Sequence, residues 1–174
     1  MKLHPTPTLS PPWGSDADWR AANISIEYHL NRYYQDLTPA IHIARDIHTR
    51  LAPILDVLDD LNRITCPRCP DVCCLAASPW YDLRDLIFLH LNRLSIPRTQ
   101  TIAGIKETCG YAGYRGCTLP RIIRPWICTW YLCPTQTANI SKRQNRSWQS
   151  LSRVFGEIKA LRKELEDEYI SAIM

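Results

Sequence analysis

Cysteine is the residue type in this sequence best placed to do chemistry. Four cysteines form a first group, C-x2-C-x3-C-C, made of Cys66, Cys69, Cys73 and Cys74. Four more form a second group, C-x7-C-x10-C-x4-C, made of Cys109, Cys117, Cys128 and Cys133. Thiolates suit zinc and iron–sulfur clusters, whereas magnesium and calcium prefer oxygen ligands. We therefore expect these eight cysteines to be the metal ligands.

The first group has local features that favour metal binding. Pro67 and Pro70 favour a turn at the C-x2-C pair, and such a turn leaves backbone N–H groups free to bond the sulfur atoms. Cys73 and Cys74 are adjacent, with Cα atoms about 3.8 Å apart, so one of them should serve a metal while the other serves a second metal or stays a buried thiol. A cation would offset the repulsion among the gathered thiolates.

The cysteine count leaves several alternatives open. Eight thiolates could supply two four-cysteine sites, or one site with spare thiols, and the spacing does not separate zinc from iron, including a 4Fe-4S cluster. Disulfides would need an oxidising compartment, but residues 1–14 contain no apolar stretch typical of a secretory signal. No run approaches the roughly 20 apolar residues that span a bilayer. We therefore expect a cytoplasmic protein without a membrane segment.

Histidines and carboxylates are weaker candidates for the chemistry. The five histidines lie outside both cysteine groups: His4, His29, His42, His48 and His90. His90 is the best ligand among them, because its predicted helix follows the first group, and the others should pack or lie on helix surfaces. The acidic pairs, Asp59 with Asp60 and Asp82 with Asp85, are expected to be solvated charges, and no common hydrolase, nucleotide-binding or zinc-protease motif is present.

A basic stretch overlaps the second cysteine group. Residues 106–146 hold seven lysines and arginines against Glu107 alone, a local charge of +6, with aromatic residues interleaved. Such a stretch could bind single-stranded nucleic acid by phosphate contact and base stacking. We favour a different interpretation, in which Arg124 stabilises thiolates or caps a loop and Trp126 and Trp130 shield the metal from water.

These motifs resemble a known family. A C-x2-C-x3-C-C cluster, an acidic–apolar helix and a later G-C-x-L…R-P-x-x-C segment are similar to the YkgJ-type cysteine-cluster proteins, described as chelating zinc or iron. The matching residues are Cys66, Cys69, Cys73, Cys74, Cys109, Gly116-Cys117, Arg124-Pro125 and Cys128. The resemblance covers roughly residues 64 to 133, and Cys133 is additional to the usual set.

The resemblance implies metal chelation without a single reaction. The leading expectation is a small bacterial-type metal-binding protein, more a binding or interaction protein than an enzyme, whose partners are the metal ion and a protein contacting its helical faces. One alternative is an iron–sulfur redox or protein-methylation accessory enzyme, since flagellin lysine methylases carry a similar cluster. The other is a nucleic-acid-binding module.

Helices must position the cysteines, and apolar residues show where they lie. The spacing predicts a helix over residues 16–37, with a strand as the alternative for part of it, and another from Thr38-Pro39 to Leu61 that Pro53 should kink or split. A helix should begin at Ser78-Pro79 and end near Pro97. A further helix carries apolar residues at Leu151, Val154, Ile158, Leu161 and Leu165, with the charges between them, Arg162 included, on a solvated face.

The apolar residues of the second and last helices share one pattern. Gaps alternate between three and four residues in both, which is typical of helices that pack lengthwise on each other. Hydrophobic residues at 45% and charged residues at 22% are ordinary for a globular chain. The prediction is a mostly α protein with irregular cysteine-rich loops and with its N- and C-terminal helices packed together. Residues 1–15 should form an extended Pro-rich arm, and residues 16–174 one helical domain containing the cysteine region 64–135.

Overall fold

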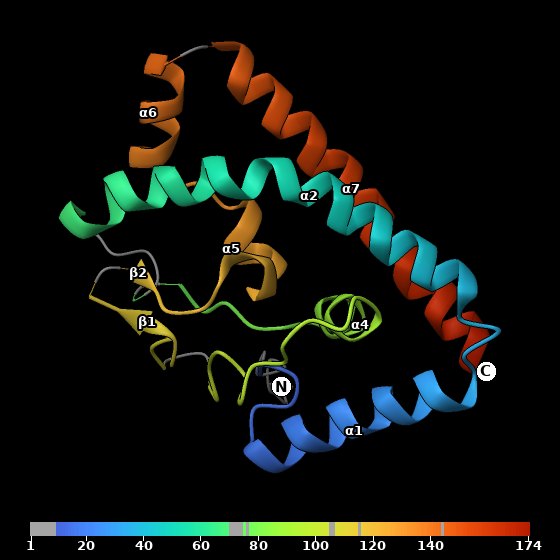
Figure 1. Cartoon of the computed structure of the whole chain (residues 1–174). Helices are drawn as coiled ribbons and strands as arrows, with labels where there is room; N and C mark the ends of the chain where they lie inside the picture. Colours follow the sequence, from blue (N-terminus) through green and yellow to red (C-terminus); the bar gives the residue numbers. More distant parts are fainter. Residues whose placement is uncertain (1–9, 70–74, 76, 105–106, 115, 144) are drawn as a thin grey trace, which may run out of the picture.

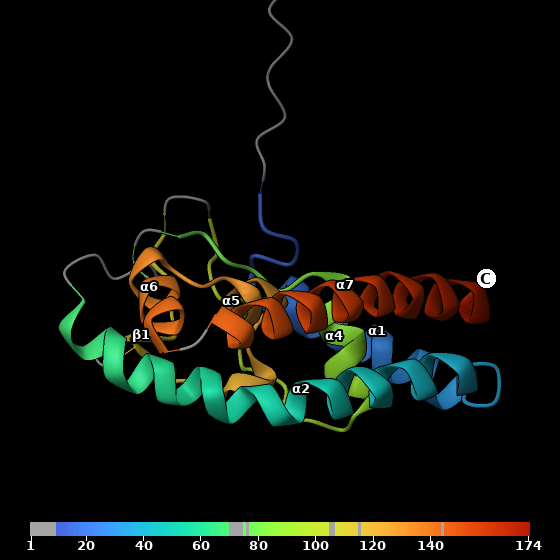
Figure 2. The ribbon, with the colours of Figure 1, turned by 90° about the horizontal axis from the view of Figure 1, so that it is seen from above.

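Two long antiparallel helices of the computed structural model lie side by side and form its largest packed surface (Figures 1 and 2). They are α2, Thr38–Thr65, and α7, Asn145–Ile173. The structure describes residues 10–69, 75, 77–104, 107–114, 116–143 and 145–174, without the side chains of 68 and 141–148. The prediction of a mostly helical fold with these two helices packed together is confirmed.

The buried face of α2 follows the predicted period. Its buried apolar residues are Ala40, Ala44, Ile47, Leu51, Ile54, Leu58 and Leu61. Pro53 lies inside the helix without splitting it, and α2 changes direction between its two ends (Figure 1). Thr38 is the first helical residue rather than the N-cap, because its hydroxyl donates to the Gln35 carbonyl at 2.8 Å.

Helix α1, Asp16–Arg32, packs on the short helix α4, Leu83–Leu91. Its predicted helical structure is confirmed, but it ends five residues before Leu37, which is fully buried at the start of α2. Trp19 anchors α1, because its buried indole N–H donates to the Pro97 carbonyl at 2.9 Å. At the other end of α1, His29 Nδ1 bonds the hydroxyl of Tyr169 on α7 at 2.8 Å.

Helix α4 begins later than Ser78-Pro79, so that prediction was wrong. Asp82 caps the helix: its carboxylate accepts from the Asp85 N–H at 2.9 Å while the Asp85 carboxylate accepts from the Asp82 N–H at 3.1 Å. The preceding residues are held extended, because the Gln100 side chain bonds both the N–H and the carbonyl of Tyr81. The helix also ends early, at Leu91 rather than near Pro97.

The hairpin and α5 of the cysteine region lie between α4 and the far end of α2, while α6 lies on the other side of that end of α2 (Figure 1). It contains the 3-10 turns η1, Cys66–Arg68, and η2, Arg121–Ile123, the two-residue strands β1, Ala112–Gly113, and β2, Gly116–Cys117, and the helices α5, Trp126–Trp130, and α6, Pro134–Arg143. Among the residues described, no helix is long and apolar enough to cross a bilayer. The extended arm falls mainly on residues 1–9, outside the described residues, and its separation from one helical domain stays a prediction.

Candidate metal centre

A small hairpin brings two cysteines of the second group together. Strands β1 and β2 pair antiparallel, with Ala112 opposite Cys117. The Cys109 carbonyl accepts from the Ala112 N–H at 3.0 Å. Cys109 therefore lies in a tight turn that leads directly into β1. Cys109 is buried and Cys117 is half-buried. The chain therefore folds back on itself and carries these two thiols at one end of the hairpin.

The hairpin also meets the first cysteine group. Cys66 opens η1 directly after α2, and the backbone of Gly116 lies against it. A Cβ atom on Gly116 would lie 3.5 Å from the Cys66 Cβ and 3.9 Å from its Sγ. Gly116 has φ +106°, a backbone conformation that residues other than glycine rarely adopt. Residues about fifty positions apart in the sequence thus lie in contact distance of each other.

Helix α5 supplies Cys128. Its first N–H, that of Trp126, donates to the buried Asp85 carboxylate at 3.0 Å, which fixes the start of the helix against α4. The preceding turn η2 is held by the buried Tyr81 hydroxyl, which donates to the Ile123 carbonyl at 2.6 Å. These two bonds hold α5 in a position where the charges of Cys117 and Cys109 act on Cys128.

Electrostatic interactions connect Cys109, Cys117 and Cys128. Burial raises the pKa of Cys128 to about 12, and the neighbouring Cys117 and Cys109 raise it further, while Arg124 lowers it. Burial also raises the pKa of Cys109, with a further contribution from Cys117. Cys66 acts on the buried guanidinium of Arg121, and Gly116, next to Cys117, lies against it. We call these four residues, Cys66, Cys109, Cys117 and Cys128, the thiol cluster.

The other predicted ligands fall into two classes. Cys69 closes η1, where its N–H donates to the Cys66 carbonyl at 3.2 Å, and Cys133 immediately precedes α6. Cys73 and Cys74 lie outside the described residues. Cys109, Cys117, Cys128 and Cys133 are free thiols, which removes them from any disulfide. Over the part of the chain that is described, no three histidine, cysteine, aspartate or glutamate side chains are gathered as metal ligands.

Of the four histidines that are described, His42 is exposed on α2 and the other three have other contacts. His90 Nε2 bonds the Asn23 side-chain oxygen at 2.7 Å, and burial lowers the pKa of His90. His48 stacks on Phe88, and His29 bonds Tyr169 as described above. Packing against neighbouring helices therefore accounts for these three rings. His4 lies outside the described residues.

Two cations of the basic stretch form hydrogen bonds within the protein. Arg121 has a side chain only 3% exposed, and it bonds the Asp59 carboxylate at 2.7 Å and the Leu58 carbonyl at 3.2 Å. Arg124 donates to the Leu119 carbonyl at 2.9 Å and lowers the Cys128 pKa, as both expected roles require. These two charges are therefore engaged within the protein rather than offered to a nucleic acid. Asp59 is an ion-pair partner rather than a purely solvated charge.

A buried charge cluster is the main feature that sequence reasoning missed. Arg162 of α7, 4% exposed, bonds Asp82 and Asp85, each at 2.9 Å, so the expectation of solvated charges was wrong at Arg162 and Asp85, whereas Asp82 keeps 47% of its side chain exposed. Burial raises the pKa of Asp85 to about 6, while Arg162 acts to lower it. An available signal was position: Arg162 lies four residues after Ile158 and three before Leu165, on the buried face of α7.

Gly116→Ala should destabilise the hairpin that joins the two cysteine groups. Alanine is strained at φ +106°, at a cost of about 1–3 kcal/mol in the free energy of unfolding, while its Cβ would make only ordinary van der Waals contact with Cys66. Gly156→Ala is the control, because that Cβ meets nothing within 4 Å and alanine favours a helix interior. Urea unfolding should show opposite signs for the two variants. Equal stability of Gly116→Ala and wild type would contradict the positive φ at this turn.

Comparison with known proteins adds no relative. No family model matches the chain, and no curated protein or solved structure matches it. The similarity to YkgJ-type proteins therefore rests on the cysteine spacing and on the R-P-x-x-C element alone. What the site can do has to be argued from its own residues.

Proposed function

We propose that this chain is a metal-binding protein of the YkgJ-like cysteine-cluster type, which holds zinc or iron through thiolates. The observation that supports the proposal is the approach of the hairpin, at Gly116, to Cys66 of the first cysteine group, together with the electrostatic influence of Cys117 and Cys109 on Cys128. These residues come from separate turns, strands and helices. Packing alone does not require thiols from such separate parts of the chain to lie near one another.

Electrostatics supports a cation at the thiol cluster. Burial raises the pKa values of Cys109 and Cys128, and neighbouring thiolates raise them further, so ionised thiols in this environment are disfavoured. A bound divalent cation or iron–sulfur core reverses this effect and keeps the thiols deprotonated. Arg124 contributes a fixed positive charge in the same direction.

The donor set fits a soft metal. Cys66, Cys109, Cys117 and Cys128 would hold it, and the remaining cysteines of the first group are further ligands or the start of a second site. All-sulfur ligation favours zinc or iron, and a closed four-thiolate site would supply structural stabilisation. Reduced thiols of this kind are typical of the cytoplasm, where we place the protein. Exposed Ile24 and Tyr28 on α1 are apolar side chains available to a protein partner.

Metal analysis of protein purified without oxygen tests this proposal. The full chain should contain zinc or iron in whole-number proportion to protein, colourless with zinc and brown with an iron–sulfur cluster. Treatment with a chelator should release the metal and expose the cysteines to an alkylating reagent. Metal-free protein that neither takes up zinc nor assembles a cluster, and whose cysteines react equally with and without added metal, would contradict the proposal.

A further inference from the structure

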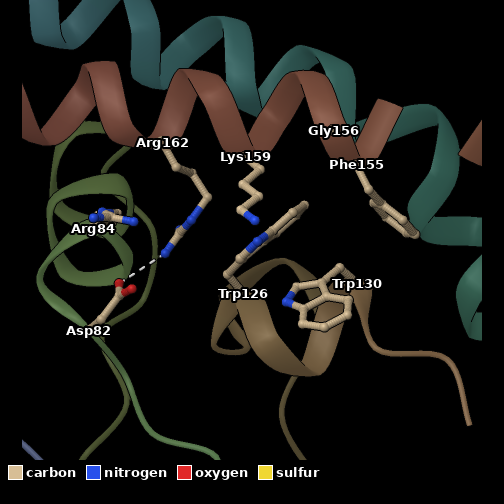
Figure 3. Close-up of a pocket in the computed structure, with 8 residues that line it drawn as sticks. All are labelled: Asp82, Arg84, Trp126, Trp130, Phe155, Gly156, Lys159 and Arg162. Atoms are coloured by element: carbon tan, nitrogen blue, oxygen red, sulfur yellow. Dashed lines mark hydrogen bonds and ion pairs between the residues drawn. The ribbon is translucent and has the colours of Figure 1, made fainter. Parts of the chain in front are cut away.

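A cavity of about 270 Å³ lies between the start of α4, the short helix α5 and the middle of α7 (Figure 3). It is separate from the thiol cluster. Trp126 and Trp130 are four residues apart on α5 and line the cavity, whereas Cys128, midway between them, belongs to the opposite face of the helix. None of the cavity-lining residues is a proposed metal ligand.

Aromatic rings form one side of this cavity. The Trp126 ring meets Phe155 of α7 edge to face, with centroids 5.8 Å apart and an interplanar angle of 80°. Trp130 is 41% exposed and extends the same side toward solvent (Figure 3). Gly156, which has open space where a Cβ would stand, leaves room beside these rings. A flat apolar group could lie against Trp130 without displacing a packed side chain.

Cations form the other side of the cavity, and two of the three are held in ion pairs. Arg162 is paired with the capping carboxylate Asp82, and Arg84 is paired with Glu166 at 2.7 Å. Lys159 points from α7 toward the Trp126 ring (Figure 3), and within the described part of the chain no ion pair is recorded for it. Once the paired charges are set aside, one positive charge remains at the cavity.

The framework around this charge is rigid. The Arg162 guanidinium lies over the Trp126 ring at 5.6 Å from its centroid, and its bonds to Asp82 and Asp85 hold it there. This stacking fixes the orientation of Trp126, so the ring is preformed rather than assembled on binding. A preformed aromatic wall with one convergent charge is typical of small-molecule sites.

We propose that this cavity binds a small planar aromatic anion, such as an aromatic carboxylate. The ring would lie against Trp130 and Phe155, and the carboxylate would meet the Lys159 ammonium. The cavity is slightly smaller than the roughly 300–1,000 Å³ of drug-sized ligand sites, which limits the ligand to about one or two rings. Aromatic walls also attract cations, but the positive charge of Lys159 that remains after the ion pairs are set aside disfavours a cationic ligand.

The test compares three probes that share one ring: indole-3-acetate, the neutral indole-3-acetamide and the cationic tryptamine. Each is titrated into the ¹⁵N-labelled full chain, and the indole N–H signals are assigned by Trp→Phe substitution. Indole-3-acetate should shift the Trp126 and Trp130 signals saturably and leave the buried Trp19 signal in place. Its affinity should exceed that of the amide by up to about fivefold, the contribution of one half-exposed ion pair, and tryptamine should bind most weakly.

Lys159→Gln identifies the charge responsible. It should reduce the affinity for indole-3-acetate to that for the amide and leave amide binding unchanged. Lys163→Gln, which removes the same charge one turn later on α7 outside the cavity, should change neither. Failure of indole-3-acetate to saturate, equal binding of all three probes, tighter binding of tryptamine, or equal effects of the two substitutions would each overturn the proposal. Metal content does not enter these measurements, so they stand apart from the proposed function.

Discussion

Cys128→Ser is expected to remove the metal from the protein. A serine hydroxyl is not deprotonated at neutral pH and is a poor ligand for zinc or iron, so a four-thiolate site would lose one anchor. Metal affinity should fall by more than about 100-fold, because even residues that only support a ligand change it by 10- to 100-fold. Competition against a coloured chelator measures the affinity, and thermal unfolding should show a lower midpoint in the presence of zinc.

Cys133→Ser is the matched control for this change. Cys133 belongs to the same sequence group and is also a free thiol, but it lies at the start of α6 and is not part of the thiol cluster. Retained metal in this variant would show that the cluster suffices, whereas loss of metal would extend the ligand set to Cys133, as the sequence predicted. Cys128→Ser protein that binds zinc as tightly as wild type would contradict the proposed centre.

Arg162→Met is expected to lower the free energy of unfolding by about 3–5 kcal/mol at neutral pH, the usual cost of leaving a buried charge without its partner. Methionine fills much of the same space, but Asp85, 5% exposed, would lose the cation that balances it. The change would also release Trp126, whose N–H bonds Asp85 and whose ring lies under the guanidinium. Chemical denaturation of both proteins measures the difference.

The loss in the free energy of unfolding of Arg162→Met should depend on pH in a defined direction. The pKa of Asp85 is raised in the folded protein to about 6, so its contribution to stability is fully present below its ordinary pKa and is lost as pH rises through about 6. Without Arg162 the folded-state pKa rises further. The deficit of Arg162→Met should therefore shrink as pH is lowered from 7 to 5, because protonation removes the unpaired charge.

Arg153→Met separates this effect from a general loss of charge on α7. Arg153 is 73% exposed and lies 3.9 Å from Glu157, so its removal should change stability by less than about 1 kcal/mol at any pH. A similar effect of the two substitutions, or a deficit in Arg162→Met that is constant from pH 5 to 7, would show that Asp85 is not the group left unbalanced.

The long helices were predictable because their signal is local and repeated. Each apolar residue of α2 adds to the same period, so the error from any one of them is small, and the buried residues from Ala44 to Leu61 match the expectation. The start of α4 was not predictable in this way. Ser78-Pro79 carries a genuine start signal, but Gln100 and Thr101 bond the backbone of residues 79–81, and such long-range contacts are absent from local patterns.

The candidate site was also predictable only in part, where its signal is local. The type and spacing of the cysteines indicated the chemistry, but only the folded hairpin shows which of them lie together. Residues that hold the site escaped notice, because Arg162 stands in a run of charges that is typical of a solvated face. Its spacing from Ile158 and Leu165 places it on the buried face of α7, but the partners that balance its charge, Asp82 and Asp85, lie some eighty residues earlier and leave no local signal.

The packing of α2 on α7 has a kinetic consequence. These helices are partners in space, yet the chain from residue 66 to residue 144 separates them, so they cannot associate as a simple helical hairpin. Closing so long a loop is entropically costly and slows folding. An ion that tied Cys66 to Cys128 early would shorten the effective loop, and refolding in the presence of zinc should then be faster as well as more complete.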